Sequence, residues 1–258
     1  MNPNKYPPAV NDELAYPGAL SVGSKGVGVK RVQEWLSYHG FATAIDSDFG
    51  SATAAALSAF QQKKKISLNS TVDDVTWKAL IEPIVNALED GTGAQLDDRI
   101  TSIAKNHLSM EPREFGGDNR GPWVRIYTGG HEGTEWKWCA GFVTFIMRQA
   151  CIELGTPMPV AGSLSCDTLA AQAKDKQRLV TSESVVANGA AWQGLGGAYI
   201  FLVRNGAGDW RHTGFGFRGP TGAFGTIEGN TNDNGTDNGF EVCARTRAAA
   251  GKDFVRLI

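Results

Sequence analysis

Apolar residues in the first third of the chain recur every three or four positions, which predicts amphipathic helices. A first helix is expected after Gly28 and should end at Gly40. Its apolar face consists of Val29, Val32, Trp35 and Leu36. A second helix is expected from Ser51, which can cap it, and a third from about Asp73. Three short helices in this space predict a small all-α domain over residues 20–82.

The last third of the chain has the shorter periodicity of β-strands. One expected strand is a continuous apolar run, and in the next His212 and Gly214 alternate with Thr213 and Phe215. The expected strands are 198–203, 210–217, 223–229, 240–245 and 254–258. Helices followed by an antiparallel sheet predict an α+β fold for residues 97–258.

Two segments outside these regions are expected to lack a core of their own. Residues 1–19 are rich in proline, which opposes regular structure, so we expect a flexible N-terminal arm. Residues 83–96 begin at Pro83 and contain a Gly-Thr-Gly sequence, so we expect a linker. A chain of 258 residues is long enough for the two domains that this division predicts, residues 20–82 and 97–258.

Cys139 stands in the first turn of an expected helix. Counting from it, apolar residues recur at Phe142, Val143, Ile146 and Ala150. A thiol at a helix N-terminus faces unpaired backbone N–H groups and the positive end of the helix dipole. Both favour the thiolate, which is the nucleophilic form. The alternative is a small buried apolar residue, as most unpaired cysteines are.

Composition narrows the classes of function. The formal net charge is −2, so the chain lacks the polycationic character of a nucleic-acid-binding protein. No apolar stretch is long enough to span a membrane, so no membrane insertion is expected. The first ten residues lack the apolar core of a signal peptide. We therefore expect synthesis without a Sec signal and delivery by other means.

The four cysteines do not follow a metal-binding pattern. Cys139, Cys151, Cys166 and Cys243 include no Cys-x-x-Cys pair, and no His-x-x-x-His occurs, which argues against a zinc site. If one cysteine is a nucleophile, the other three cannot all pair with one another. We interpret them as mostly buried thiols.

A thiol nucleophile needs a base and a group that orients the base. His212 is expected on a central strand beside two glycines that leave its face open, and we favour it. His131, in a Gly-rich loop shortly before Cys139, is the alternative. Glu228 and Asn230 are two residues apart on the returning strand, so both point to one face. Either can accept a hydrogen bond from the imidazole, and we favour Glu228 as the closer partner.

Residues 20–82 contain short sequence markers in one order. They are Val29-Lys30-Arg31-Val32-Gln33, Gly40-Phe41, Asp46, Phe49-Gly50, Thr53, Phe60-Gln61, Val72-Asp73 and Thr76-Trp77-Lys78-Ala79-Leu80. This order resembles the three-helix peptidoglycan-binding domain of bacterial and phage cell-wall hydrolases. The resemblance implies bacterial peptidoglycan as the partner. The alternative is a helical cap that only packs on its neighbour.

Residues 97–258 contain a second ordered set. It consists of Trp138-Cys139-Ala140-Gly141-Phe142-Val143, then His212, then Glu228 and Asn230. This order resembles the CHAP family of cysteine amidases and peptidases, in the papain-like group that includes the NlpC/P60 enzymes. The resemblance implies a papain-like hydrolase domain with Cys139 as nucleophile and His212 as base. Glu228 and Asn230 match the orienting positions.

Together these features predict a two-domain peptidoglycan hydrolase. The cysteine would attack an amide of the stem peptide or the muramoyl–alanine linkage, and the sequence is compatible with both. Trp136, Trp138 and Trp210 are expected to bind substrate. We expect no metal or organic cofactor and a monomeric protein. A holin or a secretion system is expected to deliver it to the cell wall or periplasm.

Two other functions are compatible with the same residues. A non-catalytic wall-binding protein would keep the fold without the chemistry. A transamidase or transpeptidase would use the same acyl-enzyme and pass it to an amine instead of water, so only an assay with an amine acceptor separates it from a hydrolase.

Overall fold

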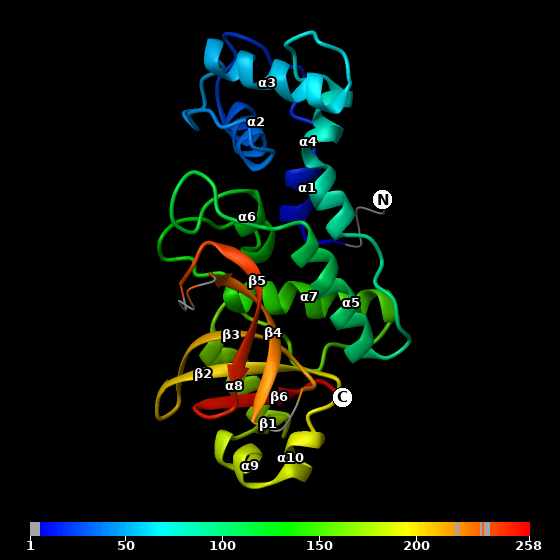
Figure 1. The fold of residues 1–258 in the computed structure, drawn as a ribbon, viewed down its shortest axis with the longest axis vertical. Helices are drawn as coiled ribbons and strands as arrows, with labels where there is room; N and C mark the ends of the chain where they lie inside the picture. The colour runs from blue at the N-terminus through cyan, green and yellow to red at the C-terminus, as the bar shows by residue number, and fades with distance from the viewer. Residues whose placement is uncertain (1–5, 220–221, 233, 235–237) are drawn as a thin grey trace. The chain divides into compact units, whose positions relative to one another are not determined.

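The computed structural model describes residues 6–219, 222–232, 234 and 238–258 (Figure 1). Its contacts divide the chain into two compact units. The first unit, here the N-terminal unit, consists of Met1–Asn86 and Arg113–Thr134. The second, here the sheet unit, consists of Ala87–Pro112 and Glu135–Ile258. None of the helices in the described part of the chain is both long and apolar enough to cross a membrane.

The N-terminal unit is helical, as the sequence predicted. Its helices are α1 (Pro8–Leu14), α2 (Val27–Tyr38), α3 (Ser51–Lys64), α4 (Asp74–Ala87, whose last residue falls in the sheet unit) and α6 (Pro122–Thr128). The expected apolar face of α2 is fully buried, and Phe60 of α3 and Trp77 of α4 are buried as well. Burial of such large side chains contributes about 1.5–3 kcal/mol each to the free energy of folding.

Two buried glutamines fix the turns between the first helices. The side chain of Gln33 donates to Asp46 Oδ1 at 2.8 Å and accepts from the Ser47 backbone N–H at 2.9 Å. Gln61 repeats this arrangement one helix later, donating to Asn69 Oδ1 at 2.9 Å and accepting from the Ser70 N–H at 3.2 Å. Each buried side-chain amide is therefore satisfied by polar groups of the turn beside it.

Residues outside the expected helical domain also belong to the N-terminal unit. The described part of the expected arm contains α1, in which Val10 and Glu13 are buried. Residues 1–5 lie outside the described part. Trp123 of α6 places its ring 6.1 Å from that of Trp35. The unit boundaries thus differ from those expected at residues 82 and 97, because an apolar and ionic core joins segments distant in sequence.

The expected linker also differs from the structure at its start. Helix α4 continues through Pro83 to Ala87. A proline inside a helix removes one backbone hydrogen bond, and here the buried side chains of Ile84 and Ala87 hold the helix beyond it. Tertiary packing thus overrides the local signal.

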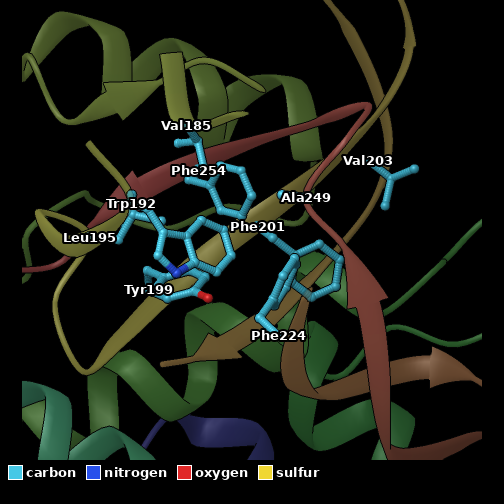
Figure 2. Packing of buried hydrophobic residues seen from close by; sticks show 9 residues of the cluster. All are labelled: Val185, Trp192, Leu195, Tyr199, Phe201, Val203, Phe224, Ala249 and Phe254. Atoms are coloured by element: carbon cyan, nitrogen blue, oxygen red, sulfur yellow. The ribbon is translucent and has the colours of Figure 1, made fainter. Parts of the chain in front are cut away.

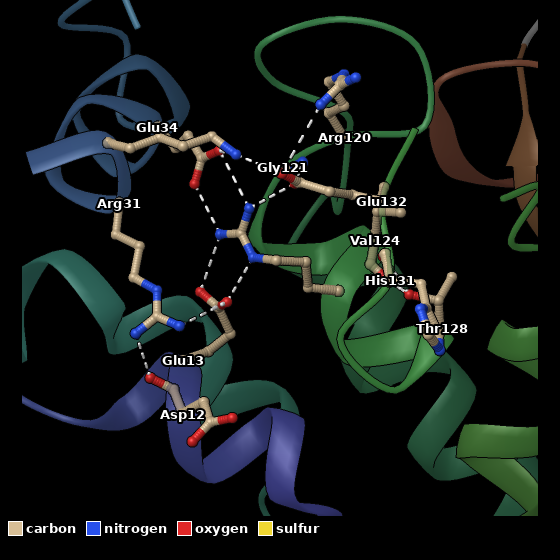
Figure 3. A network of polar contacts seen from close by, with 12 residues as sticks. Asp12, Glu13, Arg31, Glu34, Arg120, Gly121, Val124, Thr128, His131 and Glu132 are labelled. Carbon is tan, nitrogen blue, oxygen red and sulfur yellow. Dashed lines mark hydrogen bonds and ion pairs between the residues drawn. The ribbon is translucent and has the colours of Figure 1, made fainter. Parts of the chain in front are cut away.

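Arg125 of α6 is the centre of an ion cluster in the N-terminal unit. Figure 3 shows the carboxylates around it, Glu13, Glu34 and Glu132. Its Nε lies 2.6 Å from Oε1 of Glu13 on α1, and its Nη2 lies 2.7 Å from Oε2 of Glu34 on α2. Its Nη1 lies 2.7 Å from Oε2 of Glu132. Glu13 and Glu34 have 1% and 0% exposed side chains, so this arginine is the shared cation of two buried carboxylates.

The sheet unit contains an antiparallel sheet of six strands in the order β1-β6-β2-β3-β4-β5. The strands are β1 (Leu179–Val180), β2 (Ala198–Gly206), β3 (Asp209–Phe217), β4 (Ala223–Thr231), β5 (Glu241–Ala248) and β6 (Lys252–Arg256). Its helices are α5 (Leu96–Ser109), α7 (Cys139–Leu154), α8 (Cys166–Asp175), α9 (Ser182–Ala187) and α10 (Gly189–Gln193). Helices together with an antiparallel sheet confirm the α+β class.

Both faces of strand β2 are covered, which explains its continuous apolar sequence. Tyr199 and Phe201 face an aromatic cluster that includes Trp192 of α10 (Figure 2). The other face, on the side of Phe215, is covered by α7, whose Phe142 ring lies 6.4 Å from that of Phe215. The sheet is thus held between α7 and the pair α9–α10.

The ladder between β3 and β4 is short. These strands pair only from Phe215↔Ile227 to Phe217↔Gly225. Before Phe215, β3 remains paired with β2 but not with β4. His212 of β3 and Glu228 of β4 lie in the part where these two strands are not paired, and α7 contacts both strands.

Candidate active site

Cys139 is the first residue of α7, as the sequence predicted. Trp138 is the N-cap, with φ −113° and ψ 11°, and its carbonyl accepts the hydrogen bond of Phe142 N at 2.8 Å. The polar segment before Trp138 ends there, and the following residues are almost all buried. The thiol is 3% exposed and lies beside unpaired N–H groups of the first helical turn.

His212 and Glu228 are brought together across the gap between β3 and β4. Nε2 of His212 lies 2.8 Å from Oε2 of Glu228, and both side chains are fully buried. The carboxylate fits there because Gly214 has no side chain: a Cβ at Gly214 would lie 2.8 Å from Cγ of Glu228. Glu228 is thus the closer partner of the imidazole, as we expected.

Arg247 and Thr226 hold Glu228 from the other side. Nε of Arg247 lies 2.6 Å from Oε1 of Glu228, and Nη2 lies 2.6 Å from Oε2. The Thr226 hydroxyl donates to Oε1 at 2.5 Å. Burial opposes ionisation of Glu228, but Arg247 and His212 hold its pKa at about 2. The sequence analysis missed Arg247, because nothing in a short β-strand shows which distant carboxylate its arginine meets.

The second ring nitrogen of His212 is available to Cys139. Nδ1 is buried and has no hydrogen-bond partner among the described residues. The thiol and the ring are close enough for each to shift the pKa of the other. They do so without a hydrogen bond of standard geometry, as is common before substrate binds. Burial alone would lower the pKa of His212, but interactions with Cys139 and Glu228 raise it to about 9.

A second cysteine lies beside the first. The Sγ atoms of Cys139 and Cys166 are 3.9 Å apart. This contact, His212 and the Thr213 N–H lower the pKa of Cys139 well below its ordinary value, although burial opposes them. The contact with Cys139, together with burial, raises the pKa of Cys166. The two pKa shifts have opposite signs, so the contact favours a proton on Cys166 and a thiolate at Cys139.

Cys166 shares with Cys139 the feature that marks a reactive cysteine in the sequence, a position at the start of a helix. It is the first residue of α8, after Ser165, whose hydroxyl accepts from the Thr168 N–H at 3.3 Å. The sequence therefore placed two cysteines at helix starts, although only one was considered reactive. All four cysteines are buried thiols, in agreement with the expectation for the three that were not assigned a role.

Asn230 makes no hydrogen bond to the imidazole, whose Nε2 meets Glu228 and whose Nδ1 has no partner among the described residues. Its backbone is left-handed, with φ 57°, and the β4–β5 register shifts between Glu228 and Thr231. Its Nδ2 donates to Asn238 Oδ1 at 3.1 Å, and its carbonyl accepts from Gly239 N at 2.9 Å. The irregularity thus interrupts the simple alternation that placed Asn230 beside Glu228, and the Asn230 amide bonds to Asn238.

The other histidines are engaged elsewhere. His107 is fully buried, its Nε2 lies 3.4 Å from Oε1 of Gln149, and burial lowers its pKa to about 4. His39 Nε2 lies 2.8 Å from the Leu80 carbonyl. His131, the alternative base, is exposed in the N-terminal unit.

A hollow of about 470 Å³ opens at the two cysteines. It is lined by Glu135, Trp136, Lys137, Cys139, Ser163, Leu164, Ser165, Cys166, Trp210 and Arg211. Two larger hollows, of about 640 and 620 Å³, are lined by neither cysteine. We call the hollow lined by Cys139 and Cys166 the cysteine cleft. Its aromatic and charged lining suits a polar ligand chain that also carries apolar groups.

Two of the three expected substrate-binding tryptophans line this cleft, Trp136 and Trp210. Trp138 does not, since it is fully buried. A Cβ at Gly229 would lie 2.8 Å from Cζ3 of Trp138, so the indole packs directly on the β4 backbone. The expectation of a substrate contact for Trp138 is corrected: it is a core residue that anchors the start of α7.

The described residues contain no group of three or more His, Cys, Asp or Glu side chains placed to hold a metal ion. The interactions at the cleft are those of a thiolate, an imidazolium and a buried carboxylate held by an arginine.

Comparison with known proteins identifies part of the N-terminal unit. Residues 25–80 match the family model described as a putative peptidoglycan binding domain. A solved structure titled "The crystal structure of SleB N-terminal domain" is 28% identical over 26% of this chain and 93% of that chain, with a TM-score of 0.25. No curated protein matches the chain. The family match makes this a cell-wall-related protein with peptidoglycan as its partner.

Proposed function

We propose that the protein is a cysteine amidase or endopeptidase that cleaves an amide bond of peptidoglycan. The observation that carries the proposal is the Cys139–His212–Glu228 arrangement at the cysteine cleft. The peptidoglycan-binding match over residues 25–80 supplies the substrate class. The papain-like CHAP resemblance agrees with the order of the same residues in the sequence.

The thiolate of Cys139 attacks the amide carbonyl in the proposed reaction. The first backbone N–H groups of α7 point towards the developing oxyanion, because a helix start leaves them unpaired. His212, held in its charged form, gives its proton to the leaving amine. Glu228 keeps the imidazole oriented and stabilises its positive charge.

Release of the acyl group completes the cycle. The neutral imidazole takes a proton from water, and the hydroxide attacks the thioester and frees Cys139. A primary amine in place of water would give a transamidase from the same intermediate. Tethering by the peptidoglycan-binding domain raises the local concentration of the amide.

The test is digestion of purified peptidoglycan, followed by mass spectrometry of the products. A new amine on the stem peptide or on L-alanine identifies an endopeptidase or an amidase, respectively. Cys139→Ala should release no product while still sedimenting with peptidoglycan. Equal product release by wild type and Cys139→Ala contradicts the proposal. A product that incorporates an added amine identifies a transamidase instead.

A further inference from the structure

Two helix starts converge at the cysteine cleft, and each begins with a cysteine. Cys139 opens α7 and Cys166 opens α8. Their Sγ atoms are 3.9 Å apart, and both residues line the same hollow. Their exposures of 3% and 7% leave them at the floor of this opening. The proposed hydrolysis needs one thiol, so the second requires its own explanation.

We propose that Cys139 and Cys166 form a reversible disulfide that switches the enzyme off, with hydrogen peroxide as the oxidant. The assignment of Cys139 as the nucleophile rests on the proposed function; the pairing of the two sulfurs rests on their distance. A disulfide needs the sulfurs at about 2.05 Å, so they must approach by roughly 2 Å. In each cysteine only the Cβ atom separates the sulfur from the backbone, and each residue stands at a helix start. Rotation about χ1 can therefore move the sulfur by this amount.

The chemistry proceeds in two balanced steps. The Cys139 thiolate attacks one oxygen of hydrogen peroxide and becomes a sulfenic acid, and hydroxide leaves. Cys166 then attacks the sulfenic sulfur, an S–S bond forms, and the hydroxyl leaves as water with the Cys166 proton. In total, one thiolate and one thiol are oxidised, one peroxide is reduced, and one hydroxide and one water are released.

The first step prepares the second. The Cys139 contact is the largest cause of the raised pKa of Cys166, followed by burial. Conversion of Cys139 to a neutral sulfenic acid removes the negative charge beside Cys166. The pKa of Cys166 then falls, which makes the attacking thiolate more accessible when it is needed. Cys166 is therefore suited to act as the resolving cysteine.

Neither of the other two thiols lines the cysteine cleft. Cys151 lies twelve residues after Cys139 on α7, which is about 18 Å along a helix axis. Cys243 is on β5, opposite Glu228 in the ladder. A disulfide that involves Cys139 should therefore select Cys166.

The disulfide also protects the nucleophile. A sulfenic acid with no nearby thiol proceeds to sulfinic and sulfonic acids, which dithiothreitol does not reduce. With Cys166 present, oxidation stops at a reducible bond. The enzyme is then inactive under oxidising conditions and becomes active again after reduction.

The full-length protein is treated with hydrogen peroxide and digested without reduction, and the peptides are identified by mass spectrometry. We expect a Cys139–Cys166 cross-linked peptide. Peptidoglycan hydrolysis is measured before oxidation, after oxidation and after dithiothreitol. Each variant is normalised to its own reduced activity. Cys166→Ser should recover about tenfold less activity than wild type, whereas the control Cys151→Ser should recover as wild type does.

A peptide map without the Cys139–Cys166 link, or equal recovery by Cys166→Ser and wild type, overturns the inference. The peptide map of the oxidised protein does not depend on whether the protein hydrolyses peptidoglycan. If the reduced enzyme hydrolyses nothing but the cross-link forms, the proposed hydrolase function fails and the disulfide pair stands. If the reduced enzyme is active but no cross-link forms, the switch fails and the hydrolase stands.

Discussion

Two nitrogens of Arg247 bind the carboxylate of Glu228: Nε lies 2.6 Å from Oε1, and Nη2 lies 2.6 Å from Oε2. This bidentate contact fixes the orientation of the carboxylate. In that orientation, Oε2 also lies 2.8 Å from Nε2 of His212. The Arg247 guanidinium lies 5.4 Å from the centre of the Phe201 ring, which fixes its plane. Arg247 therefore positions the imidazole through Glu228, without touching the cleft.

The first prediction concerns this positioning. Arg247→Ala should lower kcat by about 10–100-fold with little change in KM, because the imidazole is misoriented while the cleft is unchanged. Removal of the arginine also removes a cause of the low pKa of Glu228. In the wild type Cys139 sets the acid limb of the pH–rate profile. In this variant protonation of Glu228 should set it instead and move it to higher pH. Arg247→Lys should restore charge but not the bidentate contact, and so rescue only part of the rate.

Arg245→Ala is the matched control for Arg247. Arg245 lies on the same strand, and its Nη1 donates to Thr231 Oγ1 at 3.0 Å. Its loss should leave the pH–rate profile in place. A profile that moves equally in both variants would mean that the arginines act on strand stability alone.

The second prediction is the pH dependence of hydrolysis. The active pair is thiolate and imidazolium, so activity should appear as Cys139 deprotonates, well below the ordinary thiol pKa of about 8.5. It should fall as pH rises through about 9, where His212 loses its proton. Glu228→Gln removes one cause of the raised pKa of His212, so the alkaline limb should move to lower pH.

Iodoacetamide labelling of Cys139 against pH checks this ion pair independently of turnover. The exposed Glu183 is the control position, because it pairs with Arg204 rather than with the cleft. Glu183→Gln should leave the profile unchanged. A thiol that begins to label only near its ordinary pKa would exclude the ion pair.

The third prediction separates Glu228 from Asn230. Glu228→Gln should lower kcat by at least about 10-fold, since it removes the charge that supports imidazolium. Asn230→Gly accommodates the left-handed φ of 57° and should stay within about 3-fold of wild-type kcat. Steady-state kinetics and a thermal melt measure both. A larger kcat loss for Asn230→Gly would return Asn230 to the catalytic arrangement.

The fourth prediction concerns the close packing around Gly214 of β3. A Cβ at Gly214 would lie 2.8 Å from Cγ of Glu228 and 2.9 Å from Cε1 of Phe201. Gly214→Ala should therefore destabilise the protein by about 1–3 kcal/mol and reduce activity. Gly225→Ala on β4 is the control, because a Cβ there meets no atom within 4 Å. Thermal melts that shift equally for both variants would contradict the packing argument.

The fifth prediction tests the ion cluster of the N-terminal unit. Arg125→Ala leaves the buried Glu13 and Glu34 without their shared cation, and should destabilise this unit by about 3–5 kcal/mol. Arg120→Ala removes a 45% exposed partner at 3.9 Å from Glu132 and should cost less than about 1 kcal/mol. Calorimetry and co-sedimentation with peptidoglycan measure the loss. Equal melts for the two variants would show that the cluster contributes no stability.

Local patterns predicted the parts of the fold that depend on neighbours in sequence. The helix that begins at Cys139 follows from the apolar spacing after it. The buried strand at 198–203 follows from its continuous apolar run, which is realised in β2. The helical domain follows from markers that the family match over residues 25–80 supports.

Tertiary structure alone decided which side chains meet. Cys166 and Arg247 reach the site from a different helix and a different strand, so no local period could place them beside Cys139 and Glu228. Trp138 was expected at the substrate, but packing on Gly229 buried it. Such contacts depend on strand register and helix docking. A single irregularity between Glu228 and Thr231 is enough to interrupt the alternation, and Asn230 bonds to Asn238 rather than to the histidine that its sequence position favoured.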